Sequence, residues 1–205
     1  MQRRSFITTL AGLTLAASTA QAAAGFNAID ITGSTIGPDY KLTYADGKPA
    51  SLRDFRGKVV MLFFGYTQCP DVCPTTLARA VEIKRLLGAD ADKLQVVFMT
   101  VDPERDTGAL LSEYMRAFDP TFVAVRGTAE QTARTAKDFK VFYRKVPSGS
   151  SYSMDHTAIT YVFDASGKIR LGFKHDATAQ QCADDLRLLL HPPKKDQGIL
   201  KGLFQ

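Results

Sequence analysis

Two cysteines and one histidine are the residues of this 205-residue chain whose types and positions suggest chemistry. Cys69 and Cys73 follow an apolar run at residues 59–64, which predicts a strand buried on both faces. A helical pattern opens at about Pro74, so the thiols lie where a central strand passes into a helix. The partial positive charge of a helix N-terminus favours thiolate, the form that binds a metal or attacks a disulfide.

The spacing of the two cysteines leaves more than one chemistry open. Cys69 and Cys73 enclose three residues, one more than the C-x-x-C pair of disulfide-exchange proteins. Pro70 and Pro74 stiffen this wider loop. A soft metal held by two thiolates fits the spacing, while a catalytic or a structural disulfide remains sterically possible.

The elements that must position these thiols follow the order of an α/β fold. Helical periodicity predicts helices at residues 75–87, 107–118, 128–139 and 178–190. Strands are predicted at residues 40–43, 58–64, 94–101, 121–125, 141–146, 157–163 and 168–173. This order predicts a thioredoxin-like fold with an N-terminal β-hairpin and an inserted β/α segment at about residues 120–146. The serine-rich residues 147–155 are expected to form a mobile loop.

His156 is the candidate third ligand. It directly precedes the predicted strand at residues 157–163, and in a thioredoxin-like topology that loop faces the cysteines. Two thiolates and one imidazole make a soft three-ligand set that suits copper as Cu(I) or Cu(II), whereas a closed zinc site would need a fourth protein ligand. The alternative is an ordinary surface histidine.

Composition limits the class of protein. The chain is 45% hydrophobic and 23% charged, which indicates one globular domain with a sizeable core. The formal net charge is +5, and Arg3 and Arg4 in a predicted leader supply two of these charges. Basic and aromatic residues do not alternate along the chain, so we expect no nucleic-acid partner.

The first 22 residues resemble a twin-arginine export signal and predict a periplasmic protein. Paired arginines precede a short apolar stretch, and Ala20-Gln21-Ala22 fits a cleavage site. An uncleaved leader would instead anchor the chain to the membrane. We expect a flexible lead-in at residues 23–36, a thioredoxin-like domain at 37–190 and a polar tail at 191–205.

Three motifs carry a resemblance to a known family. The stretches F-F-G-Y-T-Q-C-P-D-V-C-P, V-D-P-E-R-D-T and D-H-T-A-I-T-Y-V-F-D-A-S-G-K resemble those of the Sco/SenC family. Members are thioredoxin-fold copper proteins that help to assemble the dinuclear copper centre of cytochrome c oxidase. The resemblance implies that Cys69, Cys73 and His156 bind copper. It also implies a partner, the copper-bearing subunit of the oxidase or another periplasmic copper chaperone.

The resemblance allows a second role, and this chain differs from typical family members in one respect. A Sco/SenC protein could also act as a thiol reductase that keeps the acceptor cysteines reduced. Family members are often tethered by a transmembrane helix, whereas this chain shows a twin-arginine-like leader. We therefore expect contact with the membrane only through the partner or through an uncleaved leader.

Other residues are secondary candidates. Cys182 shares a helical face with Leu186 and Leu189, which predicts a buried core thiol rather than a redox or dimerising one. The loop at residues 102–106 is expected near the site, either as a docking or supporting loop or as a solvated turn. Three roles are open for Asp155: it could orient His156, supply an outer-shell oxygen, or be an ordinary loop residue. We expect Phe64 and Tyr66 to flank the site, and His175 and His191 to be surface residues.

Together these patterns predict a periplasmic copper-binding metallochaperone, a carrier rather than an enzyme. The competing hypothesis is a thiol–disulfide oxidoreductase or a peroxidase-like antioxidant without obligate copper. In that case Cys69 and Cys73 would be catalytic and His156 dispensable.

Overall fold

The computed structural model describes residues 25–37 and 39–192. The strands are β1 (Ile29–Asp30), β2 (Leu42–Tyr44), β3 (Pro49–Ala50), β4 (Val59–Gly65), β5 (Leu94–Thr100), β6 (Val123–Arg126), β7 (Tyr143–Ser148), β8 (Ser151–His156), β9 (Thr160–Phe163) and β10 (Ile169–Phe173). The α-helices are α1 (Val72–Leu87), α2 (Gly108–Phe118), α3 (Ala129–Asp138) and α4 (Ala179–Leu190), with 3-10 helices at Leu52–Phe55 and Gly88–Lys93.

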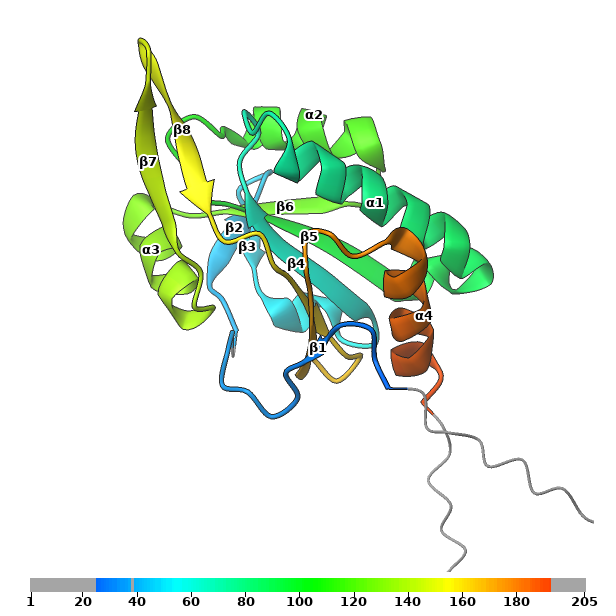
Figure 1. Cartoon of the computed structure of the whole chain (residues 1–205). Helices are drawn as coiled ribbons and strands as arrows, with labels where there is room; N and C mark the ends of the chain where they lie inside the picture. Colours follow the sequence, from blue (N-terminus) through cyan, green and yellow to red (C-terminus); the bar gives the residue numbers. More distant parts are fainter. Residues whose placement is uncertain (1–24, 38, 193–205) are drawn as a thin grey trace, which may run out of the picture.

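An eight-stranded sheet forms the centre of the described chain, in the order β1-β10-β9-β4-β5-β6-β2-β3 (Figure 1). Strand β4 runs parallel to β5 and antiparallel to β9, and all seven of its residues are buried. This arrangement explains why its sequence is continuously apolar instead of alternating. The thioredoxin-like fold predicted from the sequence is confirmed, and the thiols follow the carboxyl end of β4, as predicted.

Successive side chains of β4 pack on opposite faces of the sheet. Phe63 contacts Phe98 of β5, and Phe98 contacts Tyr114 of α2. Phe64 contacts Phe139, which caps the C-terminus of α3. The sheet is therefore covered on both faces, with α2 over one and the end of α3 over the other. Helix α1 packs against α4 (Figure 1).

The first helix begins earlier than predicted. The sequence places the start of this helix at about Pro74, whereas α1 begins at Val72. Proline is tolerated in the first turn because the N–H that it lacks would have no partner within the helix. Cys73 consequently lies inside the first turn of α1. The other three helices begin within one residue of their predicted starts, and Thr107, Thr128 and Thr178 cap them.

The serine-rich segment that follows α3 is not the mobile loop that the sequence suggested. Strands β7 and β8 pair antiparallel as a separate two-stranded sheet, with Gly149 in the turn at a φ of 58°. The next strand, β9, starts at Thr160 instead of residue 157. His156 is therefore the last residue of the hairpin strand β8.

The N-terminal region is partly built into the sheet. The hairpin β2–β3 turns at Asp46-Gly47, as predicted, and β1 pairs with β10 inside the segment expected to be a flexible lead-in. Residues 1–22 and most of the tail at 191–205 lie outside the described residues, so the leader and tail predictions stay predictions. None of the helices formed by the described residues has the length and apolar character needed to span a membrane.

Candidate metal centre

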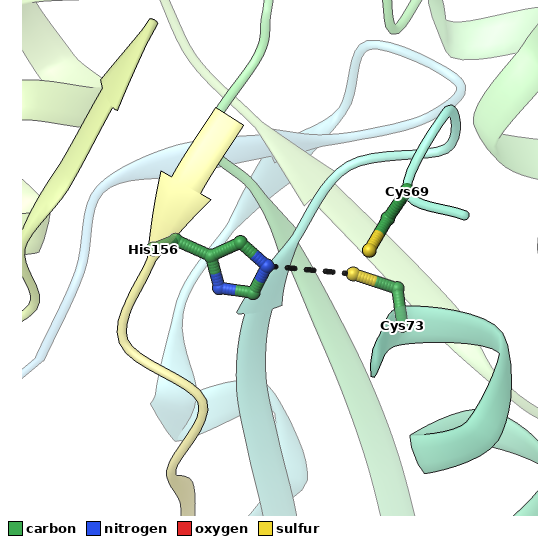
Figure 2. Close-up of side chains that lie close together, drawn as sticks. All are labelled: Cys69, Cys73 and His156. Atoms are coloured by element: carbon green, nitrogen blue, oxygen red, sulfur yellow. Dashed lines mark hydrogen bonds between the residues drawn. The ribbon is translucent and has the colours of Figure 1, made fainter. Parts of the chain in front are cut away.

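Cys69, Cys73 and His156 converge from three elements (Figure 2). Cys69 lies in the thiol loop, which we define as residues 66–71 between β4 and α1. Cys73 comes from the first turn of α1, and His156 from the end of β8. One ligand atom from each residue lies within 4.8 Å of the other two, and Cys73 Sγ is 3.6 Å from His156 Nε2. The three residues selected from the sequence therefore form one cluster.

The His156 ring is held with a nitrogen lone pair facing the sulfur atoms. Its Nδ1 lies 3.1 Å from the carbonyl oxygen of Thr157. A carbonyl oxygen only accepts hydrogen bonds, so Nδ1 carries the proton and Nε2 is left free. The Tyr66 ring makes an edge contact with the imidazole at 6.0 Å between centroids. These two contacts fix the ring as a potential metal ligand.

Gly65 provides the space that Cys73 occupies. A Cβ atom at position 65 would lie 2.6 Å from Cys73 Sγ and 2.7 Å from Cε2 of Phe98. Both separations are closer than atoms can approach without displacement. The buried Cys73 thiol can therefore occupy its position only because residue 65 has no side chain. This role of Gly65 was not recognised from the sequence.

The two thiols of the cluster are electrostatically unequal. Cys73 is fully buried, while Cys69 is partly exposed. A hydrogen bond from Cys73 lowers the pKa of Cys69 to about 3, assisted by the backbone amides of Asp71 and Cys73. The hydrogen bond with Cys69, together with burial, raises the pKa of Cys73 far above its ordinary value. The metal-free site therefore holds a Cys69 thiolate beside a Cys73 thiol, consistent with the thiolate expected at a helix N-terminus.

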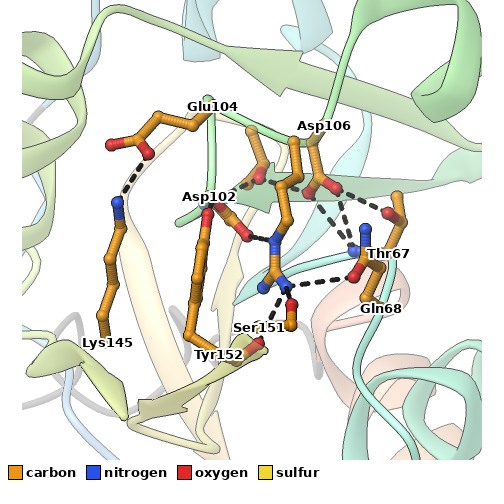
Figure 3. A network of polar contacts seen from close by, with 10 residues as sticks. Thr67, Gln68, Asp102, Glu104, Asp106, Lys145, Ser151 and Tyr152 are labelled. Atoms are coloured by element: carbon orange, nitrogen blue, oxygen red, sulfur yellow. Dashed lines mark hydrogen bonds and ion pairs between the residues drawn. The ribbon is translucent and has the colours of Figure 1, made fainter. Parts of the chain in front are cut away.

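The loop at residues 102–106 supports the thiol loop (Figure 3). Asp106 is fully buried and accepts hydrogen bonds from Thr67 N at 3.2 Å, Thr67 Oγ1 at 2.5 Å and Thr100 Oγ1 at 2.5 Å. Burial raises the pKa of its carboxyl group, and these hydrogen bonds oppose the shift. The sequence singled out this loop, but it gave no signal for the two threonines that contact it.

Two of the secondary candidates do not reach the cluster. Asp155 ion-pairs with Arg144 across the hairpin at 3.0 Å, because alternation along β8 turns it away from His156. Of the roles left open for Asp155, orienting the histidine is excluded, since the Thr157 carbonyl does so and Asp155 pairs with Arg144 instead. Phe64 packs against Phe139 in the core and does not flank the site, unlike Tyr66.

The remaining cysteine and histidines lie apart from the candidate centre. Cys182 is fully buried in the core, as predicted, and burial raises its pKa to about 11. His191 is exposed and pairs with Asp90 at 2.7 Å. His175 is partly buried rather than simply on the surface, and its carbonyl oxygen accepts a hydrogen bond from Arg79.

The chemistry of the donor atoms indicates which metal the cluster suits. Within the described residues, it is the one group of three or more cysteine, histidine or acidic side chains arranged to hold an ion. Two sulfur atoms and one imidazole nitrogen are soft ligands that suit copper. A structural zinc ion would require a fourth protein ligand, which this cluster does not contain.

The fold and the cluster define a class: thioredoxin-like proteins with two thiols and an imidazole grouped as a candidate metal site beside the central strand. A profile of the SCO1/SenC family matches residues 30–191, and the chain belongs to this family. It is 34% identical to the SCO2-like protein of Rickettsia felis over 155 residues, covering 74% of this chain and 76% of that protein.

Two further relatives support the assignment. The mitochondrial SCO2 homologue of Mus musculus is 34% identical over 153 residues, which cover 73% of this chain and 60% of that protein. The structure of Bradyrhizobium japonicum ScoI with copper bound is 39% identical, with a TM-score of 0.69. The match covers 75% of this chain and 99% of that structure.

Proposed function

We propose that the protein is a copper metallochaperone that binds one copper ion through Cys69, Cys73 and His156 and passes it to an acceptor. The observation that carries this proposal is the convergence of two sulfur atoms and a free imidazole nitrogen within 4.8 Å. The copper-bound structure of the related Bradyrhizobium japonicum protein supports copper as the metal.

The difference in pKa and exposure between Cys69 and Cys73 suits a copper carrier. Cys69 is ionised and partly exposed, so it is the ligand that incoming copper meets first. Binding of the ion at the second sulfur displaces the Cys73 proton, because metals bind thiolate. Copper then leaves by ligand exchange, as acceptor thiolates replace Cys69, Cys73 and His156 one after another.

The acceptor we propose is the copper-bearing subunit of cytochrome c oxidase. The involvement of Sco family proteins in assembling the copper centre of that enzyme supports this choice. A second periplasmic copper chaperone is the alternative acceptor. The leader at residues 1–22 supports a periplasmic location, which fractionation of cells expressing the full chain would test.

A copper titration tests the proposed ligands. Reduced protein should bind one equivalent of Cu(II), with sulfur-to-copper charge-transfer absorption and an EPR signal. Cys69→Ser, Cys73→Ser and His156→Ala should each lower the affinity by at least about 10-fold, since each removes a ligand. Cys182→Ser is the matched control and should bind as wild type does, because Cys182 is buried in the core. Equal loss of copper binding in that control would refute the assignment.

Thiol–disulfide exchange is the second candidate function, and the low pKa of Cys69 favours it. The Cys69 thiolate would attack an acceptor disulfide and form a mixed disulfide. Cys73 would then displace the second acceptor thiol, leaving a Cys69–Cys73 disulfide and two reduced acceptor thiols. His156→Ala separates the two functions: it should abolish tight Cu(II) binding but retain disulfide reduction.

A further inference from the structure

Arg105 bonds to two segments that supply ligands to the candidate centre. Its Nη1 donates to the side-chain oxygen of Gln68 at 3.0 Å and to the carbonyl oxygen of Tyr152 at 2.8 Å. Gln68 precedes Cys69 in the thiol loop, and Tyr152 lies on β8, the strand that ends at His156. One guanidinium therefore links the loop that carries a thiolate to the strand that carries the imidazole.

The Arg105 side chain is itself held firmly by Asp102 and Tyr152. It forms an ion pair with Asp102, a carboxylate that is 1% exposed. The Tyr152 hydroxyl donates to the same carboxylate at 2.9 Å, and the guanidinium lies 3.6 Å from the centre of the Tyr152 ring. A buried carboxylate is costly without such partners, so the network favours one arrangement of the loop and the hairpin.

The hairpin depends on contacts of this kind for its position. Strands β7 and β8 form a separate two-stranded sheet, so no backbone pairing with the eight-stranded sheet fixes β8, and side-chain contacts hold it in place. An ion pair between Lys145 and Glu104 also joins the hairpin to the loop at residues 102–106, but both side chains are largely exposed. Exposed ion pairs contribute little, whereas the Arg105 side chain is only 16% exposed.

We infer that Arg105 is a positioning residue that holds the thiol loop and β8 at the separation where the two sulfur atoms and the His156 imidazole meet one copper ion. The inference rests on the proposed function, because it concerns the same three ligands. Two soft thiolates are sufficient ligands for Cu(I), while Cu(II) gains more from the imidazole nitrogen. Loss of the Arg105 link should therefore weaken Cu(II) binding more than Cu(I) binding.

Two variants break the link without removing the charge beside Asp102. Arg105→Lys keeps a cation next to the buried carboxylate but loses the planar fork that reaches Gln68 and Tyr152. Gln68→Ala removes only the contact with the thiol loop. Arg144→Gln is the matched control, because it removes a guanidinium from the exposed side of the same hairpin.

The measurements are Cu(II) and Cu(I) affinities by competition, together with NMR of the His156 ring in the metal-free protein. Arg105→Lys should lower Cu(II) affinity by roughly 10-fold, leave Cu(I) affinity nearly unchanged and shift the ring resonances of His156. Gln68→Ala should act in the same direction, and Arg144→Gln should leave all three readouts as in wild type.

Two results would overturn the inference. One is unchanged Cu(II) affinity and unchanged His156 resonances in Arg105→Lys. The other is an equal loss of Cu(I) and Cu(II) binding in both variants, which would indicate general loosening of the fold. If the wild-type protein binds no copper, the proposed function is refuted but the positioning role of Arg105 is not. The NMR comparison of the metal-free proteins still tests whether Arg105 positions His156.

Discussion

At the scale of single residues, the candidate centre pairs one ionised thiol with one protonated thiol. The hydrogen bond from Cys73 is the first cause of the low pKa of Cys69, about 3. Above that pH, Cys69 is already a thiolate, so its alkylation by iodoacetamide should change little between about pH 8 and pH 5. An ordinary cysteine, with a pKa of about 8.5, would slow about tenfold per pH unit over the same range. Mass spectrometry of the modified peptides would measure both rates.

A variant and a control make this prediction specific. Cys73→Ala removes the hydrogen bond, so the pKa of Cys69 should rise and its alkylation at about pH 5 should fall by more than about 10-fold. Cys182→Ser should leave the Cys69 profile unchanged, since the two thiols are not in the same cluster. A wild-type rate that falls about tenfold per pH unit would contradict the ionised state of Cys69.

The three residues of the candidate centre could be selected from the sequence, but the residues that hold them in place could not. Cys69 and Cys73 are adjacent to a recognisable strand-to-helix junction, and His156 precedes a recognisable strand. Asp106 supports the thiol loop through Thr67, 39 positions earlier, and no local pattern reports a contact of that separation. The orientation of Asp155 depends on the strand pairing of β8, which its serine-rich sequence hides.

At the scale of elements, the end of β4 and the start of α1 are fitted to each other at Gly65. The Cβ of Gly65→Ala would meet Cys73 Sγ and the Phe98 ring, so one of them must move. We expect a loss of about 1–3 kcal/mol in the free energy of unfolding, as is usual for an overfilled core. Displacement of Cys73 should also weaken Cu(II) binding. Urea unfolding and copper titration of the same preparation would measure both effects.

Gly25→Ala is the matched control for this substitution. A Cβ at position 25 meets no atom of the described residues within 4 Å. Stability and copper affinity should both stay at the wild-type level in that variant. Wild-type copper affinity in Gly65→Ala would show that Cys73 does not need the space at position 65.

The hairpin β7–β8 shows where element prediction failed and why. Pairing with β7, more than the intrinsic preference of its residues, makes Ser151–His156 a strand. Tyr152, Met154 and His156 do alternate, and Met154 is buried, but Ser151, Ser153 and the nearby Gly149 resemble a loop. The long helices and the apolar strands β4 and β5 were predictable, because burial dictates their patterns locally.

At the scale of the whole molecule, one buried carboxylate ties the N-terminal segment to the last helix. Asp185 of α4 is 1% exposed and accepts hydrogen bonds from Asn27 N and Nδ2 at 2.9 Å and from Ala28 N at 2.8 Å. The adjacent strand β1 then pairs with β10 at one edge of the sheet. The order of elements predicted the sheet topology, but this closure between residues more than 150 positions apart was not predictable.

Asp185→Ala should destabilise the fold without altering the candidate centre. Its loss removes three hydrogen bonds between a buried carboxylate and the part-buried N–H groups of Asn27 and Ala28, which should cost roughly 2–3 kcal/mol in the free energy of unfolding. Asp184→Ala is the matched control, because Asp184 is exposed and pairs only with neighbours on α4, so its loss should cost less than about 1 kcal/mol. Because Asp185 contacts none of the three ligands, Cu(II) affinity at temperatures where both variants are folded should equal that of wild type.

Equal stability of the two variants would show that the N-terminal closure adds nothing to the fold. A lower copper affinity in Asp185→Ala alone would instead show that this closure reaches the metal centre through α4 and α1, which pack against each other.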